Sequence, residues 1–270
     1  MIHLSPFGGL SDGGRFKSGR VEFGEVRGWS RARYLWRSAE EGAKVALIME
    51  PYKDQVAAWP KEGRHILAQF DDETILVYQA YRPEIGRFAV ENGEFGGEFS
   101  FARMSWVKPN FLWMMYRSGW GTKENQEVTL ALRIRRAFFD RLLAEAVPSS
   151  CDHEQFATED EWSRAVGRSS VRLQWDPDHH PSGAKLDRRA IQLGLRGEVL
   201  EAFGRHELVE VLDLSEFVAK QRSLLLSSGV SALVTPRERV YRPADPAVVA
   251  RLRLADRDAE PPAAPDPAST

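Results

Sequence analysis

Three cations and many aromatic side chains are crowded into residues 101–120, F-A-R-M-S-W-V-K-P-N-F-L-W-M-M-Y-R-S-G-W. The cations are Arg103, Lys108 and Arg117, and the stretch also holds three of the eight tryptophans of the chain. Cations are costly to bury unless an anion or another polar group pairs with them. Aromatic rings stack on planar ligands, and Arg or Lys pairs with phosphate. The stretch therefore predicts a cleft for an aromatic, anionic ligand; the alternative is a core helix and nothing more.

Two glutamines are the polar exceptions on strands that are otherwise apolar. Residues 74–81, T-I-L-V-Y-Q-A-Y, have the β-branched and aromatic content of a strand, and Gln79 shares the apolar face. In a second strand, Ala190 and Gly194 leave room beside Gln192 for another backbone or a ligand. A polar amide on an apolar face must find partners, so each glutamine is either an internal hydrogen bonder or part of a site lining.

Common catalytic and metal-binding motifs are absent from the sequence. It has no G-x-S-x-G, no P-loop, no H-E-x-x-H and no kinase motifs. The run Cys151 to Glu154 and the group Asp176, His179 and His180 contain residue types that ligate metals. Both lie in polar segments, and their spacing matches no defined site, so we expect no metal. Nothing places a base beside Cys151, which argues against a nucleophilic thiol.

A central helix should position the crowded stretch. Pro109 fits the first turn of a helix, and Gly119 suits the left-handed residue that ends one. Apolar side chains from Phe111 to Tyr116 surround this helix on all sides, so it should lie inside the domain.

Strands and helices alternate along the rest of the chain, with too many short strands for regular crossovers. We predict an α+β fold with short strands in a split or two-sheet core around the buried aromatic helix. Further helices are predicted at about residues 30–49, 83–92, 137–146, 197–203, 215–226 and 246–254, and strands at 74–81, 98–107, 127–134, 171–175, 190–195 and 208–212.

The predicted domain runs from residue 64 to residue 255. Residues 1–63 are predicted to be an extension, with a glycine-rich flexible arm to about residue 28, the helix at 30–49 and a linker from Pro51 to Gly63. Residues 256–270 are rich in Pro and Ala and should form a disordered tail.

The composition is typical of a globular cytoplasmic protein. The 270 residues are 43% hydrophobic, which is enough to bury a good core. A net charge of −2 gives no overall attraction to nucleic acid or to anionic membranes. The apolar runs are too short to cross a bilayer, and no signal-peptide pattern is visible. The single cysteine excludes an internal disulfide and fits a reducing cytosol. The oligomeric state is not indicated.

Four runs of sequence resemble the motifs of one family, a domain of unknown function. The runs are V-Y-Q-A-Y at 77–81, R-M-S-W-V-K-P-N-F-L-W-M-M-Y-R-S-G-W at 103–120, Q-W-D-P at 174–177 and R-x-x-I-Q-L-G-L at 188–195. The resemblance covers about residues 64–254, including E-R-V-Y-R-P at 238–243. The name of the family carries no activity.

The order of the predicted elements is also similar to that of ADP-ribosyltransferases. Those enzymes bind NAD in a cleft between two small sheets. They use a polar residue on the first strand, a Ser or aromatic motif on the second and usually a Glu on the fifth. By order along the chain, this resemblance implies Gln79 at the first place, Ser105 and Trp106 with Tyr116 at the second, and Gln192 at the third.

The chemistry of NAD cleavage gives these residues their implied roles. Breaking the bond between nicotinamide and ribose develops an oxocarbenium ion, which a neutral amide stabilises less than a carboxylate would. The resemblance therefore implies Gln79, Gln192 and Glu127 as catalytic residues, with Glu198 as another candidate carboxylate. The implied cofactor-binding residues, which would stack nicotinamide or pair with the diphosphate, are Tyr78, Arg103, Ser105, Trp106, Lys108, Tyr116 and Arg117.

Three functions follow as alternatives. The first is an NAD-binding, ADP-ribosyltransferase-like protein whose acceptor is a nucleic acid or a protein. The second is a non-catalytic nucleotide or RNA/DNA-binding module that uses aromatic stacking and phosphate contacts. The third is a partner-binding protein, which would present an apolar surface patch and no cleft.

Overall fold

The fold is built on two β-sheets, which a single backbone bridge connects. The computed structural model describes residues 24–25, 34–36 and 47–255. The first sheet has the order β12-β8-β6, with strands Leu208–Asp213, Val128–Arg135 and Thr74–Tyr81. The second has the order β4-β11-β10-β9, with β7 also paired to β11; these strands are Gly63–Arg64, Lys185–Leu195, Val171–His179, Val147–Pro148 and Ser105–Val107.

An isolated bridge between Tyr78 and Lys108 joins β6 to the end of β7. Both of its backbone hydrogen bonds form: Tyr78 N–H donates to Lys108 O at 2.7 Å, and Lys108 N–H donates to Tyr78 O at 3.2 Å. We call this junction between the two sheets the seam.

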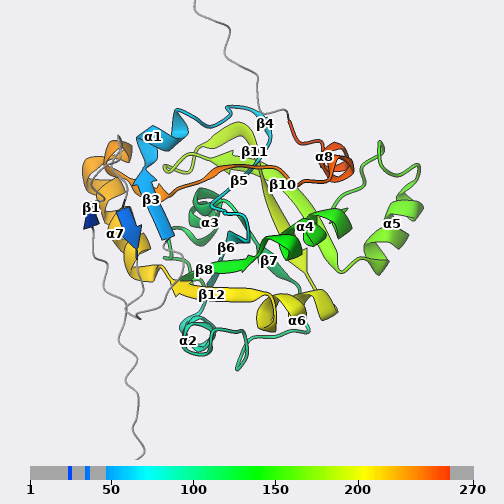
Figure 1. The fold of residues 1–270 in the computed structure, drawn as a ribbon, viewed down its shortest axis with the longest axis horizontal. Coiled ribbons are helices and arrows are strands. Elements are labelled where there is room, and N and C mark those ends of the chain that lie inside the picture. The colour runs from blue at the N-terminus through cyan, green and yellow to red at the C-terminus, as the bar shows by residue number, and fades with distance from the viewer. Residues whose placement is uncertain (1–23, 26–33, 37–46, 256–270) are drawn as a thin grey trace, which may run out of the picture.

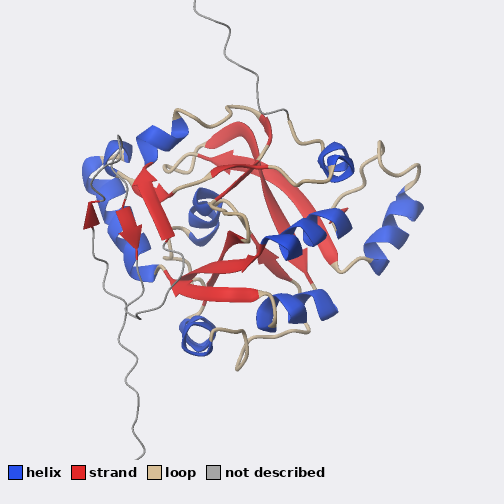
Figure 2. Ribbon diagram, viewed as in Figure 1, coloured by secondary structure: helices blue, strands red, loops and turns tan. Residues whose placement is uncertain are grey.

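The remaining strands form two smaller sheets, and helices cover the sheets (Figures 1 and 2). One small sheet contains β1 (Gly24–Glu25), β2 (Tyr34–Trp36), β3 (Leu47–Pro51) and β13 (Val234–Pro236), and the other pairs β5 (Ile66–Ala68) with β14 (Arg239–Tyr241). The helices are α1 (Tyr52–Val56), α2 (Pro83–Asn92), α3 (Phe111–Ser118), α4 (Arg136–Glu145), α5 (Glu159–Arg168), α6 (Gly197–Arg205), α7 (Ser215–Ser228), the 3-10 helix η1 (Val230–Ala232) and α8 (Pro246–Leu252).

Helix α3 lies at the centre of the molecule and packs against β6 of one sheet and β10 of the other (Figure 1). Residues 111–115 are buried, as the apolar pattern predicts for a central helix. The side chain of Asn110 caps the helix by accepting a hydrogen bond from Trp113 N–H at 2.6 Å. Pro109 therefore precedes the cap and does not lie in the first turn. Gly119 ends the helix with φ of 60°, as expected.

Strand β6 is buried on both faces because it separates two hydrophobic clusters. Ile75 and Val77 point into one cluster, whereas Leu76 and Tyr78 point into the other. The apolar, β-branched run at 74–81 is therefore a central strand, and the predicted α+β class is confirmed.

The predicted helix at residues 30–49 is wrong, because β2 and β3 occupy parts of it. In β3 the buried residues Leu47 and Met49 alternate with the less buried Ile48, which is the period of a strand. Residues 51–63 also hold a helix, α1, in place of a simple linker. Most of the predicted flexible arm and all of the predicted disordered tail lie outside the described residues; within the arm, Gly24–Glu25 form strand β1, which pairs with β2. No helix in the described ranges is long and apolar enough to cross a membrane.

Two further boundaries differ from the prediction. The strand predicted over 98–107 is limited to β7 at its end, and residues 159–168, for which no element is predicted, form helix α5. Thr158 caps α5 by accepting a hydrogen bond from Glu161 N–H. The sequence T-E-D-E at 158–161 is the capping-box pattern that would have identified this helix.

Candidate functional site

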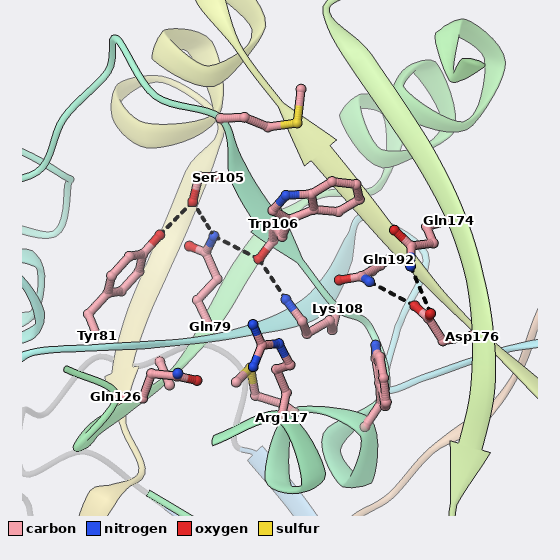
Figure 3. Close-up of a pocket in the computed structure, with 14 residues that line it drawn as sticks. Gln79, Tyr81, Ser105, Trp106, Lys108, Arg117, Gln126, Gln174, Asp176 and Gln192 are labelled. Carbon is pink, nitrogen blue, oxygen red and sulfur yellow. Dashed lines mark hydrogen bonds between the residues drawn. The ribbon is translucent and has the colours of Figure 1, made fainter. Parts of the chain in front are cut away.

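A pocket of about 560 Å³ opens at the seam, beside α3 (Figure 3). Its size is typical of a small-molecule site. Strands β6, β7, β10 and β11 and helix α3 all contribute to it. The lining residues are Gln79, Ala80, Tyr81, Met104, Ser105, Trp106, Lys108, Trp113, Met114, Arg117, Gln126, Gln174, Asp176 and Gln192.

Gln79 is tied to β7 through its amide nitrogen. The Nε2 atom donates to Ser105 Oγ at 2.8 Å and to Trp106 O at 3.1 Å, and Ser105 Oγ also bonds Tyr81 OH at 2.6 Å. Gln79 is only 2% exposed, yet its Oε1 has no donor among the described residues. A buried acceptor without a donor is costly, and this one belongs to a side chain that lines the pocket.

Lys108 places a buried amine at the pocket. Its side chain is 5% exposed, and its only hydrogen bond within the described residues runs from Nζ to Trp106 O at 3.1 Å. Burial and, to a smaller extent, the nearby charge of Arg117 lower the pKa of Lys108 to about 7, and the charge of Asp176 opposes this shift. The amine is therefore close to half protonated at neutral pH.

Asp176 is a pocket carboxylate that two glutamine amides hold in place (Figure 3). Gln174 Nε2 donates to Oδ1 at 2.8 Å, and Gln192 Nε2 donates to Oδ2 at 2.7 Å. Gln174 and Gln192 are directly opposite each other in the pairing of β10 with β11. The two amides fix the orientation of the Asp176 carboxylate. This carboxylate lies next to Gln192, the neutral residue that the sequence analysis placed at the catalytic position.

Trp113 forms one wall of the pocket and ends a stack of three rings. His179 stacks on Trp113 and on Tyr116, with ring centroids 5.1 Å and 3.5 Å apart. Trp113 is 6% exposed, and its Nε1–H has no acceptor in the described structure. Burial lowers the pKa of His179, which favours the neutral imidazole inside the stack.

Six of the ten residues predicted for the site line this pocket: Gln79, Ser105, Trp106, Lys108, Arg117 and Gln192. Arg103 lines a neighbouring pocket of about 500 Å³, which shares Tyr81, Met104 and Ser105 with the first. The remaining three lie elsewhere. Tyr78 is fully buried against Phe111, and Tyr116 stacks on His179 without lining the pocket.

Glu127 and Glu198 are exposed and line none of these pockets. The Glu127 carboxylate accepts a hydrogen bond from the backbone of Asn125. Asp176 is the carboxylate that sequence reasoning missed as a catalytic candidate. The sequence presents Asp176 as a possible metal ligand, but the alternation of Arg172, Gln174 and Asp176 also places it on one strand face beside Gln174.

The space beside Gly194 is filled by the protein itself. Gly194 is opposite Trp106 in the pairing of β11 with β7. A Cβ on Gly194 would lie 2.7 Å from Met104 Sδ and 3.0 Å from the Trp106 ring. The predicted close approach at this glycine is therefore made by another strand and its side chains, and not by free space for a ligand.

Among the described residues, no group of three or more His, Cys, Asp or Glu side chains could hold a metal ion. In the run 151–154, Asp152 pairs with Arg253, and Cys151 Sγ lies 3.9 Å from His153 Nδ1. Asp178, next to His179, forms a buried ion pair with Arg188 at 2.5 Å.

The chain is thus an α+β protein with a polar pocket at the seam of two sheets. Residues 65–241 match the family model of a domain of unknown function, DUF4291. Because the match spans more than half of the 270 residues, the chain belongs to this family, and the expected membership of a domain-of-unknown-function family is confirmed. No curated protein matches the chain. The family description assigns no activity, so a function has to be argued from the pocket.

Proposed function

We propose that the protein binds NAD in the seam pocket and transfers its ADP-ribosyl group to an acceptor. The observation that carries this proposal is the convergence of Gln79, Lys108, Arg117 and Gln192 from four elements on one pocket that also holds a carboxylate, Asp176. The resemblance to ADP-ribosyltransferases supports the same function by the order of the elements.

The two cations suit the diphosphate of NAD. Arg117 and Lys108 both line the pocket, and neither forms an ion pair within the described part of the chain. An anion would supply the counter-charge that these groups lack. The unused acceptor of Gln79 and the unused donor of Trp113 would bind a polar group of the ligand, such as the carboxamide of nicotinamide.

The proposed chemistry requires a negative charge near the ribose. When the bond between nicotinamide and ribose breaks, its electron pair leaves with the pyridinium nitrogen, and the ribose becomes an oxocarbenium ion. Asp176 would stabilise this cation electrostatically, because Gln174 and Gln192 hold its carboxylate in a fixed orientation. An acceptor nucleophile then bonds to the ribose carbon and releases a proton. Gln192 would act by positioning Asp176, and its own Oε1 remains available for a ribose hydroxyl.

An open nucleic-acid platform has less support from the surface. Among the described residues, the exposed large hydrophobic side chains are Val56, Tyr116, Val209 and Leu226, of which one is aromatic. Base stacking by a single exposed ring, itself stacked on His179, provides little area. The same scattered set offers no continuous apolar patch for a protein partner.

Calorimetry and product analysis would test the proposal. We expect NAD to bind the wild-type protein and nicotinamide to be released, detected by chromatography. Asp176→Asn should bind NAD but release nicotinamide at least a hundredfold more slowly, whereas the matched control Glu127→Gln should match the wild type in both assays. Gln192→Ala should weaken binding about ten- to a hundredfold, which corresponds to about 1–3 kcal/mol.

Two results would count against the proposal in different ways. The absence of heat and of a thermal shift at millimolar NAD would remove NAD as the ligand. Binding without release of nicotinamide, in the presence of protein or oligonucleotide acceptors, would instead support the non-catalytic nucleotide-binding module.

A further inference from the structure

Lys108 has the surroundings of a reactive amine. Its ammonium is desolvated, and no carboxylate within the described residues lies close enough to form an ion pair. The single Nζ contact is to a backbone carbonyl that Gln79 also uses. Desolvation and the neighbouring guanidinium of Arg117 both favour the neutral amine, which is the nucleophilic form.

The backbone at Lys108 is also fixed. Both backbone hydrogen bonds to Tyr78 hold this residue at the seam, and Asn110 begins the cap of α3 two residues later. The amine therefore faces a pocket of about 560 Å³ from a rigid position, which is a requirement for a covalent site.

We propose that Lys108 forms an imine with small anionic aldehydes or ketones that bind in the seam pocket. Arg117 would pair with the anionic group, and the amine would meet the carbonyl carbon. This reactivity does not depend on NAD as a ligand.

The step needs no added oxidant or reductant. The lone pair of Nζ forms a bond to the carbonyl carbon, and the π electrons of the C=O bond move to oxygen. Proton transfer from nitrogen to that oxygen gives a carbinolamine, and its hydroxyl then leaves with a further proton as water. The product is a C=N bond, and Asp176 in the same pocket can carry the proton between nitrogen and oxygen.

The environment also gives selectivity over the other lysines. At pH 7 an ordinary exposed lysine, with a pKa of about 10.4, is neutral in roughly one molecule in two thousand. Lys108, with its pKa lowered to about 7, is neutral in about half of the molecules. The reactive fraction is therefore on the order of a thousandfold larger, which more than offsets the lower intrinsic nucleophilicity of a weaker base.

Pyridoxal 5′-phosphate, an anionic aldehyde, is a suitable probe. The full-length protein is incubated with it at pH 7, the imine is reduced with cyanoborohydride, and labelled peptides are quantified by mass spectrometry. We expect Lys108 to be labelled at least tenfold faster than the exposed lysines. Pyridoxal without its phosphate should label Lys108 at least tenfold more slowly. Lys108→Met should lose the rapid label, and the matched control Lys53→Met, at an exposed helix position, should keep it.

A pH profile of labelling, measured on the wild-type protein, tests the inference even if Lys108→Met does not fold. Labelling of Lys108 should level off above about pH 7, whereas that of exposed lysines should continue to rise toward pH 10. Equal labelling rates for Lys108 and exposed lysines, or equal rates for the two aldehydes, would overturn the inference. Added NAD should slow the labelling if it occupies the same pocket; the absence of protection would count against NAD and not against the imine.

Discussion

The buried amine of Lys108 predicts that anion binding to the seam pocket takes up a proton. Without a bound anion, the pKa of Lys108 is lowered to about 7, mainly by burial. A bound anion supplies an opposite charge, which returns the pKa toward its ordinary value of about 10.4. At pH 7 the bound complex should therefore carry about half a proton more than the free protein and ligand.

The magnitude of the effect follows from the fraction of Lys108 that is protonated. With a pKa of about 7, this fraction is about one half at pH 7, one tenth at pH 8 and one hundredth at pH 9. An anion that contacts Lys108 Nζ directly and binds only its ammonium form should lose affinity about fivefold between pH 7 and 8 and about fiftyfold between pH 7 and 9. The larger change corresponds to about 2 kcal/mol of binding free energy. An aldehyde whose anionic group pairs with Arg117 leaves the amine of Lys108 neutral.

Titration calorimetry in two buffers of different ionisation enthalpy measures the proton directly. NAD and sulfate are suitable ligands because the charge of each is constant between pH 6 and 9. The observed heat should differ between buffers in proportion to the proton uptake, and Lys108→Met should abolish the difference. Arg117→Lys is the matched control, since it keeps a cation in the pocket and leaves Lys108 in place. A buffer-independent heat together with a flat affinity from pH 7 to 9 would refute the reasoning.

Four further predictions concern stability. Burial raises the pKa of Glu238, so this carboxyl group binds its proton more tightly in the folded protein than in the unfolded chain. The free energy of unfolding should therefore fall as the pH rises above about 4.5. Glu238→Gln should flatten this pH dependence, as measured by denaturant titrations at several pH values. Glu238→Ala should cost about 1–3 kcal/mol, because the Phe111 N–H at the start of α3 loses its acceptor. The pKa of His179 is lowered by burial, so stability should be full above about pH 6.5 and decline below it; His179→Phe should remove this decline, and an unchanged profile would contradict the assignment. Gly194→Ala should lower the free energy of unfolding by about 1–3 kcal/mol, because its Cβ would overlap the Trp106 and Met104 side chains; a neutral result would show that these side chains can move.

The parts of the fold with strong local patterns could be predicted from the sequence. Strand β6 carries a β-branched, apolar run, and Gln79 is visible as its polar exception. Helix α3 is recognisable from its apolar residues and from Gly119. In both cases the local preference and the burial agree.

The parts that depend on distant partners could not be predicted. Residues 47–51 form a strand because β2 and β13 pair with it, and β13 is remote in the chain. Asp176 became a pocket residue only through the register that places Gln174 opposite Gln192. The strand predicted at 171–175 ends before Asp176, yet β10 continues to His179 with an irregularity in its pairing after Pro177.

Hydrogen–deuterium exchange at the backbone bridge of the seam would report on ligand binding in the pocket. The amide protons of Tyr78 and Lys108 each close one hydrogen bond of that bridge, and one of them belongs to the residue whose amine faces the pocket. Any separation of the two sheets must break both bonds, so the exchange rates of these two protons with deuterium should rise and fall together. A ligand that spans the pocket and touches both sheets would slow both rates equally, whereas one that binds a single wall would leave them unchanged.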